Sequence, residues 1–310
     1  MQTGIETQDA ASASGLAFWR GAIAGRERIE PAALARMTAH PRFIDACLMS
    51  WRGSQALFEK EPLLGRSFKD ISLGFFAVFA MWLDLNGELT LSAIQDFCTK
   101  HDLASPGRVA ALMTQLRKIG YVEPHPSQTG GRKRRYIVTP AMIAGFREIF
   151  RTELMALALM EPAAGDVADR LAEPALFAPF LTAMGLGMAN IAKNKVRSPV
   201  SLFAERNGGS LILAHIAASA GPGDSVPPRQ PVPLSIAALA RQFRVSRSHI
   251  LRLLRDAEKE KLLRRHPDGS ITLDEKLRVA LLYYQAVNFM GHAACAHVAL
   301  LVAGAAPSAG

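Results

Sequence analysis

Arginine and lysine side chains gather in two short windows of the sequence. Residues 100–135 hold eight of them against two acidic residues, and residues 241–265 hold nine against three, so each window carries a net charge of +6. The whole 310-residue chain is +9 at pH 7, so the remainder is slightly acidic. Clustered guanidinium and ammonium groups are the groups that bind nucleic-acid phosphates. The alternative interpretation is two solvated helix faces.

Other reactive side chains do not form a recognisable site. His292, Cys295 and His297 are the one His/Cys cluster, but on a helix residue 297 points away from the other two, so we expect no metal site. The cysteines, which also include Cys47 and Cys98, are far apart, and this excludes a disulfide framework and indicates a reducing compartment. No P-loop, GxGxxG, HExxH or GxSxG sequence occurs. We therefore expect no enzyme, no metal and no cofactor.

The two basic windows belong to two copies of one pattern, about 141 residues apart. Each copy predicts a helix, a tight turn, a second helix and a β-hairpin. Ser105 is the expected cap of the second helix in the first copy, and Ser246 is its counterpart after a turn at Arg244. With these caps aligned, the apolar stripes coincide, because Val109, Leu112, Met113 and Leu116 match Ile250, Leu253, Leu254 and Ala257.

The first helices of the two copies align with one extra residue in the turn of the first copy. This alignment pairs Ile94 with Ile236, Phe97 with Leu239, and Cys98 with Ala240. The hairpin of the first copy has a longer loop, residues 127–135, which ends in four consecutive cations.

A helix-turn-helix followed by a hairpin resembles the winged helix-turn-helix family. The first copy is similar to the MarR type of bacterial transcription regulator through LASPGRVAALMTQLRKIGYVEPH and GGRKRRYIVTP. The second resembles a GntR- or Crp-type winged helix through IAALARQFRVSRSHILRLLRDAEKEKLL. MarR proteins typically carry one such domain in a shorter chain and dimerise through terminal helices, whereas this chain has two and could act as a covalent pseudo-dimer. The resemblance implies binding of double-stranded DNA and regulation of transcription.

The exposed sides of the two second helices and the two hairpins supply the expected interface. A recognition helix reads base edges in the major groove, and a basic wing contacts phosphates or the minor groove. The residues expected to read bases are Arg108, Gln115, Arg247, His249 and Arg252. The expected wing contacts are Arg132, Lys133, Arg134, Arg135, Arg264 and Arg265. The remaining members of the predicted interface are Ser105, Lys118, Arg244, Ser246, Ser248 and Arg255.

The predicted fold is mainly α with small β-hairpin wings, as two winged helix-turn-helix domains on a helical scaffold. The expected divisions are an N-terminal helical segment 1–70, the first winged unit 71–147, a helical connector 148–207, the second winged unit 208–283, and an apolar C-terminal helix and tail 284–310. Residues 221–231 are expected to form a flexible insertion. Residues 279–310 carry no charge, but polar residues interrupt them, so we interpret them as a buried or oligomerising helix and expect no membrane span.

These observations favour a cytoplasmic, nucleoid-associated protein that binds double-stranded DNA sequence-specifically and occludes a promoter. We expect a bipartite site with two unlike half-sites, because the exposed residues of the two helices differ. Two alternatives stay open: a plasmid-type replication initiator with tandem winged helices, and a protein-interaction scaffold without salt-dependent DNA affinity. The terminal helices could form a homodimer. The helical scaffold could hold a small effector, but no polar constellation marks a pocket, so core packing is favoured.

Overall fold

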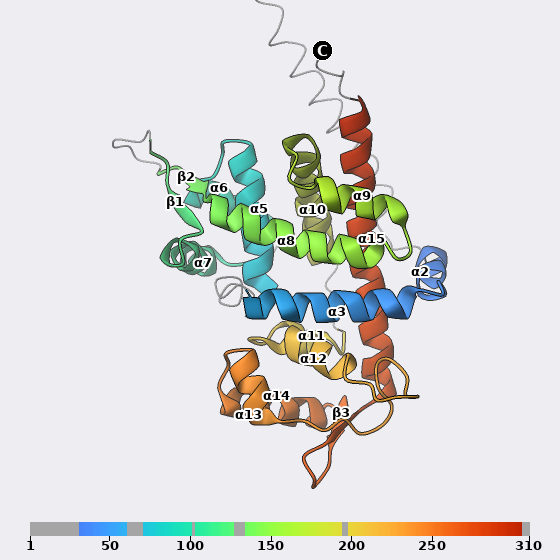
Figure 1. Ribbon diagram of the computed structural model, residues 1–310. Helices are drawn as coiled ribbons and strands as arrows, with labels where there is room; N and C mark the ends of the chain where they lie inside the picture. The colour runs from blue at the N-terminus through green and yellow to red at the C-terminus, as the bar shows by residue number, and fades with distance from the viewer. Residues whose placement is uncertain (1–30, 61–70, 101–102, 127–133, 194–197, 306–310) are drawn as a thin grey trace, which may run out of the picture.

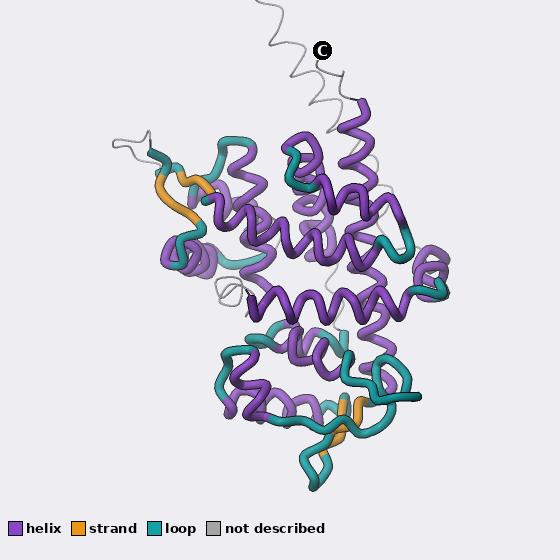
Figure 2. Tube along the Cα trace, viewed as in Figure 1, coloured by secondary structure: helices purple, strands orange, loops and turns teal. Residues whose placement is uncertain are grey.

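The computed structural model is built mainly of helices, with two small antiparallel hairpins (Figures 1 and 2). It describes residues 31–60, 71–100, 103–126, 134–193 and 198–305. The prediction of a mainly α fold with small hairpins is therefore confirmed. The parts of the predicted N-terminal helical segment that fall in residues 1–30 and 61–70 lie outside the described residues.

Two runs of elements follow the same order of three helices, a hairpin and a further helix. Unit 1 comprises α5 (Ile71–Leu85), α6 (Leu91–Lys100), α7 (Pro106–Lys118), β1 (Val122–Pro124), β2 (Tyr136–Val138) and α8 (Pro140–Leu157). Unit 2 comprises α12 (Gly209–Ala217), α13 (Ile236–Gln242), α14 (Arg247–Lys259), β3 (Leu263–Arg265), β4 (Ile271–Leu273) and α15 (Glu275–Ala305). The other helices are α2 (Pro31–Thr38), α3 (Phe43–Lys60), α9 (Pro162–Arg170), α10 (Pro174–Lys193) and α11 (Ser201–Ala204).

The two hairpins have the same register relative to the helix that precedes them. Val122 faces Val138 in the first hairpin, and Leu263 faces Leu273 in the second. The turn into each hairpin has a left-handed residue at the second position after the helix, Gly120 at φ 77° in unit 1. The equivalent residue in unit 2 is Lys261 at φ 56°, a conformation that a side chain makes less favourable. The internal repeat therefore extends from sequence to backbone conformation.

Each hairpin also receives a short third segment, which the sequence pattern did not predict. In unit 1 the Tyr136 amide donates to the Leu89 carbonyl at 2.9 Å, just before α6 begins. In unit 2 Val232 and Ile271 exchange two backbone hydrogen bonds, of 2.7 and 2.9 Å, before α13 begins. These bonds tie the hairpin of each unit to the chain that enters its first short helix.

The predicted alignment of those first short helices is wrong by three residues. The Thr90 hydroxyl accepts the Ala93 amide at 3.0 Å at the start of α6, and the Ser235 hydroxyl accepts the Ala238 amide at 3.2 Å at the start of α13. Aligning these caps superposes the buried pairs Ile94 and Cys98 on Leu239 and Phe243. The caps of the two helices are 15 residues apart in unit 1 and 11 in unit 2, so the extra length of unit 1 is four residues. The apolar pattern alone could not show how many extra residues unit 1 has, because a shift of about one helical turn leaves the apolar residues on the same face of the helix.

Helix α3 lies between the two units and packs on both (Figure 1). On one side its backbone comes close to α8, where a Cβ added to Gly53 would stand 2.6 Å from Thr152 Cγ2. On the other side the Phe58 ring meets Phe243 of unit 2 edge-on, with ring centroids 6.5 Å apart. One continuous apolar core includes residues of both units and of α3. The two units are therefore parts of one packed body.

Helix α15 is a single long helix that begins directly after the second hairpin. It packs against α10, α2, α8 and α9 and crosses the predicted boundary between residues 283 and 284. By length and composition α15 could cross a membrane, as could α9 and α10 together if that bent pair is one span. In α15, 39% of the most apolar 18-residue window is buried inside the protein.

The expected flexible insertion, residues 221–231, is a loop with defined hydrogen bonds instead. The Asp224 carboxylate accepts backbone amides from Ser225, Arg229 and Gln230 at 2.7 to 3.1 Å. The buried Arg278 of α15 donates to the Pro227 carbonyl at 3.0 Å and to the Ser225 hydroxyl at 2.9 Å. The prediction of flexibility rested on the Pro and Gly residues of the loop. The local sequence does not show that the distant Arg278 binds it.

Candidate nucleic-acid interface

Helix α7 buries one side and presents the other to solvent. Val109, Leu112, Met113 and Leu116 are all at most 3% exposed, which confirms the predicted apolar stripe. The Ser105 hydroxyl accepts the Arg108 amide at 3.3 Å, so this serine caps the helix as predicted, with Pro106 in the first turn. The predicted side chains opposite the stripe, Arg108, Gln115 and Lys118, are exposed.

Helix α14 repeats this arrangement with a stronger separation of charged and apolar sides. Ile250, Leu253, Leu254 and Ala257 are at most 1% exposed. The Ser246 hydroxyl accepts the His249 amide at 3.1 Å and lies 3.0 Å from the Ser248 hydroxyl. The exposed side carries Arg247, Ser248, Arg252 and Arg255. Arg244 is also exposed, at φ 50° in the turn before the helix.

The His249 ring is held by two groups of the protein itself. Its Nε2 lies 2.9 Å from the Asn207 carbonyl oxygen, and its Nδ1 lies 3.4 Å from Arg252 Nη2. A carbonyl only accepts and a guanidinium only donates, so the pair of contacts requires a hydrogen on Nε2 and a free lone pair on Nδ1. In this arrangement His249 positions Arg252 and has no ring nitrogen left for a base edge.

Two of the four cations predicted for the first hairpin are among the described residues. Arg132 and Lys133 lie outside them. Arg134 is exposed. Arg135 is also exposed, but its Nη2 donates to the Gly87 carbonyl after α5, at the base of the hairpin. Of the four predicted wing cations, Arg134 is thus the one the structure places at the described edge of the loop.

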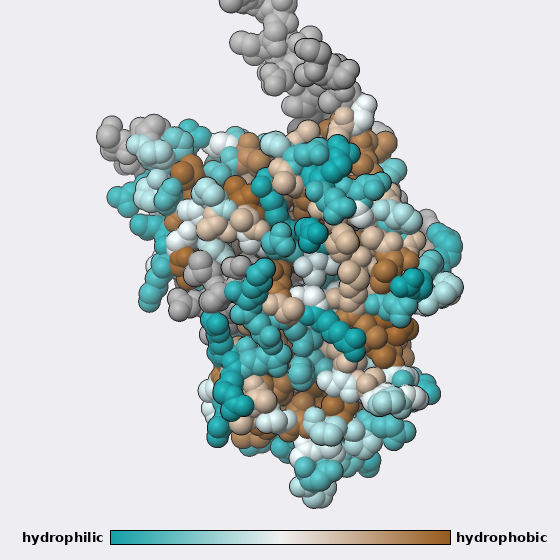
Figure 3. Space-filling model, viewed as in Figure 1, coloured by the Kyte–Doolittle hydropathy of each residue, from teal (hydrophilic) through white to brown (hydrophobic). Residues whose placement is uncertain are grey.

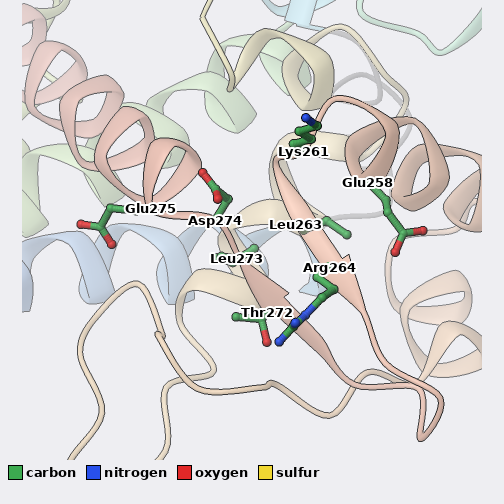
Figure 4. Close-up of a pocket in the computed structure, with 8 residues that line it drawn as sticks. All are labelled: Glu258, Lys261, Leu263, Arg264, Thr272, Leu273, Asp274 and Glu275. Carbon is green, nitrogen blue, oxygen red and sulfur yellow. The ribbon is translucent and has the colours of Figure 1, made fainter.

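The second hairpin is fastened to α14 through one arginine. The Arg265 amide and Nε donate to the Glu258 carboxylate at 3.0 and 2.7 Å, and Arg265 Nη2 lies 2.7 Å from the same group. These bonds, first from the backbone amide and then from the guanidinium, hold the pKa of Glu258 below its usual range. Arg264 is exposed, and its side chain extends away from Glu258 towards Thr272 (Figure 4). Of the two predicted cations on this hairpin, Arg264 is the one without such a partner in the described chain.

A second ion pair fixes α14 from its other side. Arg206, just after α11, donates to Asp256 with Nη2 2.9 Å from Oδ2. Together with the Asn207 carbonyl on His249, this attaches α14 to the short segment around α11. Helix α14 therefore has one side in the core, another against the segment around α11, and a third that is open to solvent.

Leu251 is one exposed residue of α14 that the sequence prediction did not include. Its side chain is 40% exposed, between Arg247 and Arg255 in the row of residues four apart. The prediction named only polar and charged residues of this helix. The spacing of four residues from Arg247 and Arg255 also places Leu251 on the exposed side, so a prediction that included apolar residues would have identified it.

Two hollows in the described chain do not resemble an enclosed ligand site. One, of about 500 Å³, is wide open between the second hairpin, the end of α14 and the start of α15; it is lined by Glu258, Lys261, Leu263, Arg264, Thr272, Leu273, Asp274 and Glu275 (Figure 4). The other, of about 20 Å³ beside Asp84, is far smaller than the few hundred Å³ typical of ligand pockets. Burial raises the pKa of Asp84, whose carboxylate accepts the Val138 amide at 3.2 Å.

The remaining reactive groups lie apart from these surfaces. No group of three or more metal-ligating side chains occurs among the described residues. His292 and Cys295 are buried, and His297 is exposed. Burial raises the pKa of the Cys295 thiol to about 12 and that of the Cys98 thiol to about 11. These thiols are not in the low-pKa state that makes a cysteine reactive.

The surface chemistry differs between the two ends of unit 2. In Figure 3 hydrophilic residues cover the edge near α13 and α14, and a hydrophobic patch lies where α15 passes α3.

No protein-family model, no curated protein and no solved structure matches this chain.

Proposed function

We propose that this protein is a sequence-specific regulator that binds double-stranded DNA through two winged helix-turn-helix units. The observation that carries the proposal is the repeated order of short helix, turn, capped helix and hairpin, with an exposed basic side on α7 and again on α14. In this proposal α7 and α14 enter the major groove, which admits an α-helix and displays a distinct pattern at each base pair.

The division of roles follows from the helix or hairpin that carries each exposed side chain. Arg247, Arg252 and Arg255 project from α14, and Arg108, Gln115 and Lys118 project from α7, so these side chains contact bases or nearby phosphates. Arg134 and Arg264 contact the backbone beside the groove. Arg265 holds the second hairpin on α14, and His249 holds Arg252.

The unlike exposed sides of α7 and α14 support a bipartite site with two different half-sites. The packing of α3 on both units supports a fixed distance and angle between them. A protein bound across such a site would occlude a promoter. We propose no catalytic step.

The test is selection of random duplex DNA by the purified full-length protein, followed by affinity measurements against salt. The expected result is an enriched motif of two unlike parts and an affinity that falls steeply with salt. Genomic motif positions at promoters would support regulation, and clustered repeats at an origin would support replication initiation instead. Binding without a motif would reduce the role to an architectural one, and the absence of binding from low to moderate salt would overturn the proposal.

A further inference from the structure

Leu251 is an exposed apolar side chain on the basic side of α14. Its 40% exposure contrasts with the adjacent Ile250, which is fully buried. In the described chain, the other large apolar side chains with similar exposure lie on α3, α5 and α15: Met49, Leu85, Val279, Tyr283, Tyr284, Leu301 and Val302. Leu251 therefore differs from them in being surrounded by the residues of the proposed interface.

The surroundings of Leu251 are cationic. Arg247 and Arg255 lie one turn before and one turn after it on the same row of the helix, and Arg252 is the next residue. All three arginines are exposed, and within the described residues Arg247 and Arg255 have no ion-pair partner. A partner that fits this surface has negative charge around a small apolar group.

The major groove of DNA offers that combination. Phosphates line its two edges, and the 5-methyl group of thymine is the apolar group that its floor presents to a protein. Leu251 is the fifth residue of α14, within the N-terminal half, which is the part of a recognition helix that contacts base edges.

We propose, on the basis of the function proposed above, that Leu251 is a specificity-determining residue that packs against the 5-methyl group of one thymine in the half-site bound by α14. The equivalent position of α7 is Ala110, which is half-buried and shorter. This thymine preference is therefore a property of the α14 half-site alone.

The test replaces each thymine of the selected duplex, one at a time, by deoxyuridine, which lacks only the 5-methyl group. Binding of the wild-type protein should weaken about fourfold at one thymine of the α14 half-site, the size expected for one methyl group removed from an apolar contact. Leu251→Ala, which gives α14 the residue found in α7, should bind the methylated duplex more weakly by a similar or larger factor. This variant should then show no further loss with deoxyuridine.

Two further variants make the result specific. Leu85→Ala removes a similarly exposed leucine from α5 and should leave the deoxyuridine response of the wild-type protein intact. Leu251→Gln replaces the apolar end of the side chain by an amide that reaches one bond further, and should move the preferred base at that position from thymine to adenine. Neither Ala nor Gln disfavours a helix, and the site is exposed, so both variants should fold, as circular dichroism can verify.

The outcomes separate this inference from the proposed function. A selected motif in which no thymine shows a Leu251-dependent response to deoxyuridine overturns the thymine contact and leaves DNA recognition standing. Failure to select any motif overturns both.

Discussion

The Ser50 hydroxyl of α3 lies 2.8 and 2.9 Å from the two carboxylate oxygens of Glu153 on α8. Asn288 and Gln285 of α15 donate to the same carboxylate at 2.9 and 3.4 Å, and the Trp51 indole donates to Gln285 at 3.0 Å. Glu153 is 8% exposed and Ser50 is 1% exposed. A buried polar network thus joins α8 of unit 1, α15 of unit 2 and the helix between them.

Removing the Ser50 hydroxyl should destabilise this junction. Ser50→Ala leaves a buried carboxylate without its shortest donor, so the free energy of unfolding should fall by about 2 kcal/mol. The matched control is Ser54→Ala, because the Ser54 hydroxyl is half-buried and 3.4 Å from Glu153, and this variant should lose less than about 1 kcal/mol. Urea denaturation of both variants measures the difference, and equal losses would show that Ser50 is not the important donor.

The structural features that the sequence predicts best are those set by residues close together along the chain. The stripe from Val109 to Leu116 and its copy from Ile250 to Ala257 follow from helical periodicity, and the caps Ser105 and Ser246 follow from the chemistry of a serine before an apolar run. The hairpins follow from short apolar strands around turn residues.

The sequence does not predict contacts between distant parts of the chain. Nothing near Glu153 indicates that Ser50, 103 positions earlier, supplies its hydrogen bond. His249 and Arg265 look like free cationic or polar side chains in the sequence, yet the Asn207 carbonyl and Glu258 hold them. These partners depend on tertiary packing and on hairpin register, so the sequence alone does not show that these two predicted interface residues already have partners inside the protein.

The proposed interface predicts different effects for an arginine that reads a base and one that binds phosphate. Arg252→Ala should reduce discrimination against the wrong base at one position of the selected motif by about tenfold or more, consistent with 1 to 3 kcal/mol for a good bidentate pair. Arg134→Ala should weaken binding to all sequences alike and reduce the salt slope by about one. Affinity measurements on single-base variants of the duplex, repeated across salt, distinguish the two. Uniform loss in both variants would contradict this division.

His249 should act through Arg252. His249→Ala removes the imidazole that accepts from Arg252 Nη2, so discrimination at the Arg252 position should fall, by less than in Arg252→Ala. The double variant should discriminate no worse than Arg252→Ala alone, because the two residues share one role. Additive losses in this double-mutant cycle would instead mean that His249 makes a contact of its own with DNA.

The Glu258–Arg265 pair should make the stability of the protein depend on pH. Its folded-state pKa lies below the ordinary value of 4.5, so its pairing with Arg265 stabilises the fold above that value, and this contribution is lost as pH falls towards the folded pKa. Glu258→Gln lacks the contribution at every pH. The difference in Tm between wild type and this variant should therefore be largest near neutral pH and shrink below about pH 4.5. A difference that stays constant into acid would exclude the ionised pair as its cause.

The packing of α3 on both units predicts that the two half-sites must keep one spacing. Besides the Phe58–Phe243 contact, Gln242 of α13 donates to Glu59 at 2.7 Å, and Gln55 lies 3.0 Å from His215 of α12. Five inserted base pairs turn one half-site by about half a helical turn, and ten restore its face but move it about 34 Å away. A rigid connection tolerates neither, so both insertions should lower the affinity to that of one half-site. Recovery at ten base pairs but not at five would show that the units separate on DNA, and tolerance of both would show that α3 does not hold them together in the complex.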